Sequence, residues 1–252
     1  ARVWRGDIED DGFNRLVLCA RLSWREVVLI RAFAKFLRQA QIPFSQAYME
    51  ETLAAYPDLT RLLVRLFGLR LDPEFDGDRD GLEGTLGAAI EQTFDSVANL
   101  DEDRILRRFF NLIDSTLRTN FFCTNANGEP EMTVAFKFDS RALDELPLPK
   151  PMREIWVYCP RFEAVHLRFG LVARGGLRWS DRREDFRTEI LGLVKAQQVK
   201  NAVIVPVGSK GGFVLKKAPQ DRDGFQEEGV ACYKLFMRAM LSITDNIVTG
   251  AI

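Results

Sequence analysis

Apolar residues in the first half of the chain recur at the three- and four-residue spacing of an α-helix. In the segment SWREVVLIRAFAKFLRQAQI the apolar positions that follow this spacing are Val27, Ile30, Ala34 and Leu37. Ser23 and Glu26 have the spacing of a capping box, in which each side chain accepts a hydrogen bond from the other residue's backbone. Pro43 stops the run, so a helix is predicted between Ser23 and Pro43.

Four further helices are predicted in the first half of the chain. One begins near Ser45, and another is opened by Pro57-Asp58 and continues through LTRLLVRLFGLRL. An acidic loop follows, and two more helices are expected over roughly residues 86–100 and 101–121. The loop TNANGEP then ends the helical pattern, so a domain boundary is predicted near Asn125.

The second half begins with short segments that are rich in β-branched and aromatic residues. MTVAFKF, EIWVYCP and AVHLRFG are separated by turn-forming residues, so they are interpreted as strands. Further along, apolar strands alternate with helical segments, which is typical of α/β domains. The predicted architecture is therefore a helical N-terminal region, residues 1–125, followed by an α/β substrate-binding domain with a mixed sheet, residues 126–252.

Composition narrows the class of protein. The chain has 252 residues, of which 46% are hydrophobic and 28% are charged, as expected of a globular protein with a real core. No apolar run is long enough to span a membrane and no signal peptide is visible, so we expect a cytoplasmic protein without a membrane partner. A net charge of −1 argues against a nucleic-acid partner, because such proteins carry a basic surplus.

Metal and phosphate motifs are incomplete. The four cysteines are far apart and His166 is the single histidine, so neither a metal site nor a disulfide framework is expected. DGDRDG resembles the start of a calcium loop, but its twelfth position is Gly87 rather than glutamate, which favours a solvated acidic loop. GSKGG lacks the spacing of a nucleotide phosphate loop. His166 is interpreted as an ordinary strand histidine on the same side as Arg168.

Charge is concentrated in one segment. Residues 171–217 contain ten Arg and Lys against four Asp and Glu, a net charge of +6, which leaves −7 for the rest of the chain. An anionic ligand is therefore expected in this segment. Within it, a helix after Ser180 has the apolar stripe Phe186, Ile190, Leu193 and Val194. Continued at 100° per residue, the stripe reaches Gln197 and Lys200, unless both turn to water at the helix end.

These polar residues lie near a strand and a set of glycines. The run from Ala202 to Val207 is predicted to be a buried strand that delivers Lys210 on a glycine loop. Glycines that would let a small ligand approach the backbone occur at Gly175, Gly176, Gly208, Gly211 and Gly212. Arg174 and Lys200 could each bind a carboxylate, and Gln197 could supply amide hydrogen bonds. Lys210 would then face the reacting carbon, where a dry basic pocket favours proton transfer.

The same residues carry a family resemblance. RGGLRWS, QQVKNAVIVPVGSKGGF and the helix between them resemble the substrate domain of glutamate dehydrogenases, and RGGLRWSDRREDFRTE is most similar to the large bacterial NAD-specific enzymes. By this resemblance Lys210 matches the catalytic lysine and Lys200 the lysine that holds the substrate α-carboxylate, with Gln197 beside it. Arg174 stands where many members have a lysine that contacts the side-chain carboxylate, which exchanges a point charge for a planar fork.

The resemblance implies oxidative deamination of L-glutamate to 2-oxoglutarate and ammonia, with NAD as hydride acceptor, by a protein that forms a homo-oligomer. No G-x-G-x-x-G follows a strand in these residues. We therefore expect a fragment that lacks activity on its own, with the nucleotide-binding domain and the catalytic aspartate beyond residue 252. Two alternatives stay open: a non-catalytic α/β module that binds a carboxylate or phosphate ligand, and a helical assembly scaffold.

Overall fold

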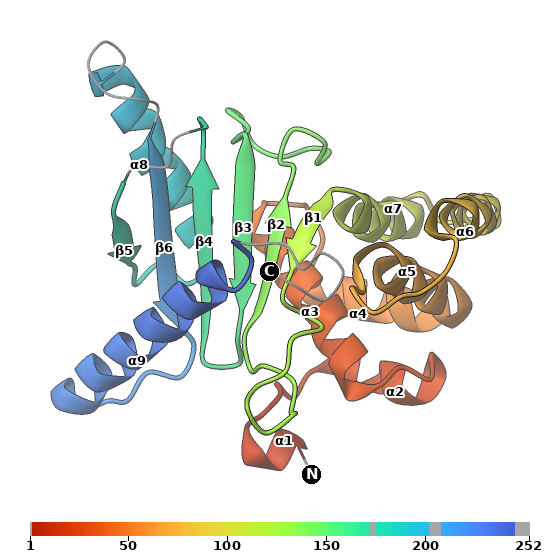
Figure 1. The fold of residues 1–252 in the computed structure, drawn as a ribbon, viewed down its shortest axis with the longest axis horizontal. Coiled ribbons are helices and arrows are strands. Elements are labelled where there is room, and N and C mark those ends of the chain that lie inside the picture. The colour runs from red at the N-terminus through yellow and green to blue at the C-terminus, as the bar shows by residue number, and fades with distance from the viewer. Residues whose placement is uncertain (1, 172–174, 202–207, 245–252) are drawn as a thin grey trace. The chain divides into compact units, whose positions relative to one another are not determined.

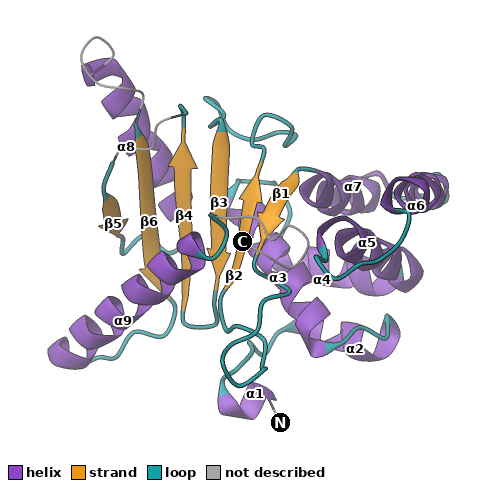
Figure 2. Ribbon diagram, in the orientation of Figure 1, coloured by secondary structure: helices purple, strands orange, loops and turns teal. Residues whose placement is uncertain are grey.

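The computed structural model describes residues 2–171, 175–201 and 208–244, with backbone only for 197–201. The chain forms two compact units. The first contains residues 1–38 and 42–115, and the second contains residues 39–41 and 116–252. Figure 1 labels the elements, and Figure 2 shows that the described part of the first unit is helical while the second contains a sheet. This order of elements confirms the predicted fold class.

The first unit contains these helices, with a 3₁₀ turn at Gly12–Arg15: α1 (Arg2–Arg5), α2 (Leu16–Cys19), α3 (Trp24–Gln39), α4 (Gln46–Ala55), α5 (Pro57–Leu71), α6 (Arg79–Phe94) and α7 (Leu100–Asp114). The capping box of α3 is formed, because the Ser23 amide donates to Glu26 at 2.6 Å and the Glu26 amide donates to Ser23 Oγ at 3.3 Å. The predicted α3 stripe is buried. Ser45 caps α4, and Pro57 is the first residue of α5, as the sequence predicts.

Two boundaries differ from the prediction. Helix α6 begins at Arg79 rather than near residue 86, because Asp78 of the DGDRDG segment accepts the Gly81 amide and caps the helix. The Asp78 carboxylate thus marks the start of the helix, which a propensity argument misses because α6 contains three glycines. Helix α7 ends at Asp114, and the next residues form strand β1 (Thr116–Thr119). The units accordingly change at residues 115–116, before the boundary predicted near Asn125.

The second unit is built on a six-stranded sheet in the order β1-β2-β3-β4-β6-β5. Its other strands are β2 (Val134–Phe138), β3 (Arg153–Tyr158), β4 (Phe162–Arg168), β5 (Leu177–Trp179) and β6 (Ser209–Leu215). Neighbouring strands are antiparallel except β5 and β6, which are parallel and joined through helix α8 (Phe186–Asn201). The sheet is therefore mixed, and the three strand segments predicted in the middle of the sequence are confirmed.

Helices cover both faces of this sheet. Helix α8 lies behind the sheet and α9 (Arg222–Leu241) crosses its front in Figure 1. On the front, the α9 face, buried Phe162 and Phe213 pack in one cluster with Cys232 and Phe236 of α9. On the α8 face, Phe186 stacks on Trp156 with ring centroids 6.0 Å apart. Because side chains alternate along a strand, each strand residue is assigned to one of the two faces.

The structure also describes the state of the cysteines and the apolar character of the helices. The four cysteines are free, and Cys159 and Cys232 are buried while Cys19 is exposed. None of the helices in the described ranges is both long and apolar enough to cross a bilayer.

Candidate substrate-binding site

Lys210 lies in strand β6, not on a glycine loop as predicted. It pairs with Leu167 of β4 in the antiparallel ladder and is half-buried. The strand predicted from Ala202 to Val207 falls outside the described residues. Lys210 shares a face with Gly212, whose added Cβ would lie 2.4 Å from Ile190 Cδ1 of α8. The lysine therefore leaves the sheet on the α8 face, near the end where β6 begins.

The glycines around Lys210 are required by packing of the chain on itself. A Cβ on Gly175 would lie 1.6 Å from the Ser209 carbonyl oxygen, and one on Gly211 would lie 2.3 Å from Leu177 Cδ2. Gly212 has no room for a Cβ beneath Ile190. Gly176, in contrast, has nothing within 4 Å of the added atom. Among Gly175, Gly176, Gly211 and Gly212, Gly176 is the one with open space around it in the described part of the chain.

A buried ion pair holds α8 on the sheet. Arg187 Nε and Nη2 donate to the two oxygens of Glu154 at 2.6 and 2.7 Å, and both side chains are fully buried. Such a two-pronged geometry fixes both distance and orientation. Removing one partner of a buried pair leaves a charge without compensation, which makes the contact far more costly to break than an exposed ion pair. The start of α8 is therefore anchored to the centre of the sheet.

The buried stripe of α8 is rotated from the predicted one. Phe186, Ile190 and Val194 are fully buried, but Leu193 is 37% exposed and Leu191 is buried instead. The prediction for Leu193 is wrong because the buried face includes Arg187, which a purely apolar pattern treats as exposed.

The side chains of the other three charged or amide candidates lie outside the described residues. Arg174 lies outside the described residues. Gln197 and Lys200 belong to α8, but their side chains lie outside the described part of the chain. The convergence of these three on Lys210 stays a prediction.

A second contact joins α8 to the edge strand. Glu189 forms an ion pair with Arg178 Nε and accepts a hydrogen bond from Ser180 Oγ, both at 2.5 Å. Arg178 lies in β5, two residues beyond Gly176, so this carboxylate ties the glycine pair's strand to the helix. Glu189 is 12% exposed and its contacts are shielded from water, whereas half of the Arg178 side chain is exposed. The contact determines how β5 and α8 are spaced on either side of Gly212.

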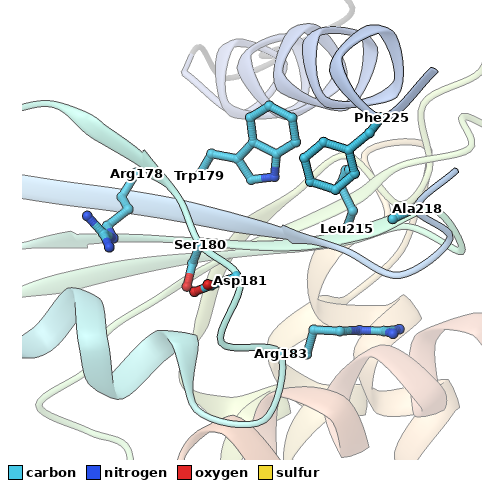
Figure 3. Close-up of a pocket in the computed structure, with 8 residues that line it drawn as sticks. All are labelled: Arg178, Trp179, Ser180, Asp181, Arg183, Leu215, Ala218 and Phe225. Atoms are coloured by element: carbon cyan, nitrogen blue, oxygen red, sulfur yellow. The ribbon is translucent and has the colours of Figure 1, made fainter. Parts of the chain in front are cut away.

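A hollow of about 480 Å³ lies beside β5 at the other end of β6. Figure 3 shows the residues that line it: Arg178, Trp179, Ser180, Asp181, Arg183, Leu215, Ala218 and Phe225. Trp179 stacks on Phe225 with ring centroids 4.8 Å apart. Lys210 is not among the lining residues, and Leu215 is the last residue of β6. This hollow is therefore separate from the end of the sheet where Lys210 begins its strand.

His166 lies on the α9 face, opposite to Lys210. It pairs with Gly211 in the ladder, and its Cδ2 is 3.1 Å from the position of a Cβ on that glycine. Burial lowers the pKa of His166 to about 4, with a smaller contribution from the charge of Arg168. The imidazole is therefore neutral near neutral pH.

Sequence reasoning missed Glu154, Arg187 and Glu189. A signal for the buried pair exists, because Glu154 is a lone carboxylate within the apolar strand REIWVY and Arg187 directly follows the buried Phe186. Their pairing across 33 residues required knowledge of which helix covers which strand. Periodicity supplies no such information.

Comparison with known proteins assigns the chain to a family. Residues 89–252 match the family described as bacterial NAD-glutamate dehydrogenase, catalytic domain, and residues 8–73 match glutamate dehydrogenase, helical motif 3. Apart from residues 39–41, the second unit lies within the segment that matches this catalytic domain. The chain belongs to the bacterial NAD-glutamate dehydrogenases.

Individual relatives agree with this assignment. The chain is 52% identical to the NAD-specific glutamate dehydrogenase of Halomonas elongata, over all of the chain and 16% of that protein. It is 53% identical to those of Mycobacterium tuberculosis, over 97% of the chain, and Pseudomonas aeruginosa, over 98%. The chain covers 16% of the length of each of these two relatives as well. The chain therefore spans about one sixth of the length of these relatives.

Breaking the buried pair is expected to destabilise the second unit. Glu154→Leu should lower the free energy of unfolding by about 3–5 kcal/mol, because it leaves the Arg187 guanidinium buried without its carboxylate. The double variant Glu154→Leu/Arg187→Met should recover most of this loss, since it removes both charges. Urea unfolding followed by circular dichroism measures both. A loss below about 1 kcal/mol in the single variant would show that the pair does not anchor α8.

Stability should also depend on pH through His166. Its pKa is about 4 in the folded chain and about 6.5 when unfolded, so between these values the unfolded chain binds more protons. The free energy of unfolding should therefore fall as pH decreases from about 6.5 to about 4. Carboxylates titrate in the same range, so the test compares wild type with His166→Gln in urea unfolding at several pH values. Parallel curves for the two proteins would contradict the prediction.

Proposed function

We propose that the chain provides the substrate-binding domain of an enzyme that oxidatively deaminates L-glutamate to 2-oxoglutarate and ammonia. The observation that carries this proposal is the position of Lys210, on the α8 face of a catalytic-domain sheet and at the end where β6 begins. Helix α8, which bears Gln197 and Lys200, covers that same face. Membership of the dehydrogenase family disfavours the non-catalytic binding module.

Each residue has a distinct role in the proposal. Lys200 binds the substrate α-carboxylate with Gln197 beside it, and Arg174 binds the side-chain carboxylate as a bidentate partner. With both carboxylates held, the α-carbon faces Lys210, whose amine accepts and donates the proton as ammonia is replaced by water. Gly176, which has open space around it, lets the substrate approach the backbone.

NAD would accept the hydride from the α-carbon. The described βαβ unit, β5–α8–β6, does not fit a dinucleotide, because its first turn, Ser180 to Asp185, contains no glycine and is crowded with charged side chains. We therefore assign none of these residues to NAD and propose that another part of the full-length protein binds it. We further propose that the full-length protein is a cytoplasmic homo-oligomer.

The first test is an assay of the 252-residue chain alone. With glutamate and NAD in excess it should produce no NADH, since no residue in it is assigned to the dinucleotide. Circular dichroism establishes that the assayed chain is folded. Sustained turnover would show that a dinucleotide site exists within these residues.

The second test separates the roles of the lysines in the full-length enzyme. Lys210→Ala and Lys210→Arg should both lower kcat by about 10²-fold or more, because an arginine stays protonated and cannot exchange a proton. Lys200→Ala should act mainly through KM for glutamate, since a carboxylate contact serves ground state and transition state alike. Lys217→Ala, at an exposed position after β6, is the matched control. A near-normal kcat for Lys210→Arg would remove Lys210 from the proton chemistry.

A further inference from the structure

The α9 face of the sheet carries paired cations at the end where β6 begins. Arg118 of β1 is directly opposite Lys137 of β2, and Arg153 of β3 is directly opposite Arg168 of β4. Ile155 packs against the cluster that contains α9 and lies opposite both Lys137 and His166, so these residues share one face. Like charges in directly opposed positions destabilise a sheet. Two such pairs on four consecutive strands need a physical reason.

The described residues compensate this charge only in part. Asp139 pairs with Arg153 at 3.0 Å, and it is the one carboxylate in the described ranges that contacts the four cations. Arg168 donates to the Gly170 carbonyl at 2.8 Å, and Arg118 donates to the Thr244 carbonyl near the end of α9. These carbonyl contacts orient the guanidinium groups but leave their charge in place. The four cations and Asp139 therefore carry a net charge of +3 together.

The proximity of these cations has an electrostatic consequence. The pKa of Lys137 is lowered, first by burial and then by the charges of Arg118, Arg168 and Arg153. The neutral His166 lies beside Arg168, whose charge also lowers the pKa of the imidazole, and Arg153 is the diagonal neighbour of His166 in β3. An anion placed here would relieve the mutual repulsion of all four cations.

We propose that this basic end of the sheet, formed by Arg118, Lys137, Arg153 and Arg168, binds a small molecule that carries a diphosphate or triphosphate group. The backbone positions of the cations span four strands, about 14 Å across, so linked phosphates can contact more of them at once than a single phosphate group can. An arginine fork can bind each phosphate group through two hydrogen bonds. A net charge of three also suits a polyphosphate better than a dicarboxylate.

This site is distinct from the proposed glutamate site. Lys210 leaves the sheet on the α8 face, whereas the four cations lie on the α9 face. The phosphate group could belong to inorganic pyrophosphate or to a mononucleotide, since the cations recognise the phosphates alone. The bridged diphosphate of a dinucleotide carries less charge and is not the proposed ligand. The proposal does not depend on the reaction at Lys210. Either one can fail without the other.

His166 provides a specific reporter, because it is the single histidine of the chain. Near pH 5.5 its imidazole should be largely neutral in the free chain and become protonated when an anion binds beside it. The experiment records the imidazole NMR signals of the 252-residue chain during titration with pyrophosphate and, separately, with a nucleoside diphosphate. Both should give a saturable shift at one site. A larger shift of the His166 signals with the nucleotide would indicate an additional contact to its base, and it would still support the site.

Variants assign the shift to the basic end of the sheet. Lys137→Gln and Arg168→Gln should each weaken pyrophosphate binding by about tenfold, as expected for losing a cation that contacts a phosphate. Lys217→Gln, exposed and outside the group, should leave binding unchanged. Lys137→Gln is expected to fold, because it removes a repulsive contact, and thermal unfolding checks this.

Three results would overturn the proposal. One is the absence of a shift with either ligand at millimolar concentration. Another is equal weakening by Lys217→Gln, which would indicate nonspecific attraction to a basic chain. The third is pyrophosphate binding that stays unchanged in both Lys137→Gln and Arg168→Gln, which would place the bound anion elsewhere on the chain.

Discussion

The buried ion pair between Arg187 and Glu154 determines how helix α8 lies on the sheet, and the proposed substrate site depends on that position. Both side chains are withdrawn from water, so their attraction must offset a large desolvation penalty and does so only in a narrow geometry. The pair is at the start of the helix and at the start of β3. An apolar contact would tolerate sliding of the helix, whereas two parallel hydrogen bonds do not.

From this anchor the remaining contacts follow along α8. One turn beyond Arg187, Ile190 packs over Gly212, and Glu189 holds Arg178 and Ser180 of the edge strand and its following turn. Any side chain at position 212 would lift the helix from β6 and strain the ion pair. The glycines near Lys210 are therefore part of the support of the site. Their presence alone does not identify the substrate.

Much of the helical unit could be predicted from the sequence because its signals are local. The capping box at Ser23 and the proline at the start of α5 each act within one turn. Strands β2, β3 and β4 were also predictable, since alternation and turn residues lie in the same short segment. The start of α6 was missed because Asp78 resembled a loop residue, although a side chain that caps a helix has the same composition.

The candidate site was less predictable because it depends on contacts between distant segments. The motif GSKGG suggested a loop, but hydrogen bonds to β4 and β5 on its two sides make it a strand, and these partners are far away in sequence. Leu193 was placed on the buried face of α8 because the stripe was drawn through apolar residues alone, whereas the buried face includes Arg187. Glu154 pairs with Arg187 on that face. A charge with a buried partner behaves, for helix orientation, like an apolar side chain.

The two faces of this sheet divide its cations into separate groups. Successive residues of β6 alternate between the faces, so Lys210 and its neighbours Ser209 and Gly211 contribute to different surfaces. Cations on opposite faces are separated by roughly 10 Å of weakly polar material, where two unit charges interact by on the order of 1 kcal/mol. If both proposed sites are occupied by anions, each ligand therefore weakens the attraction that the other experiences. The sheet keeps the two sites sterically independent while leaving them electrostatically coupled.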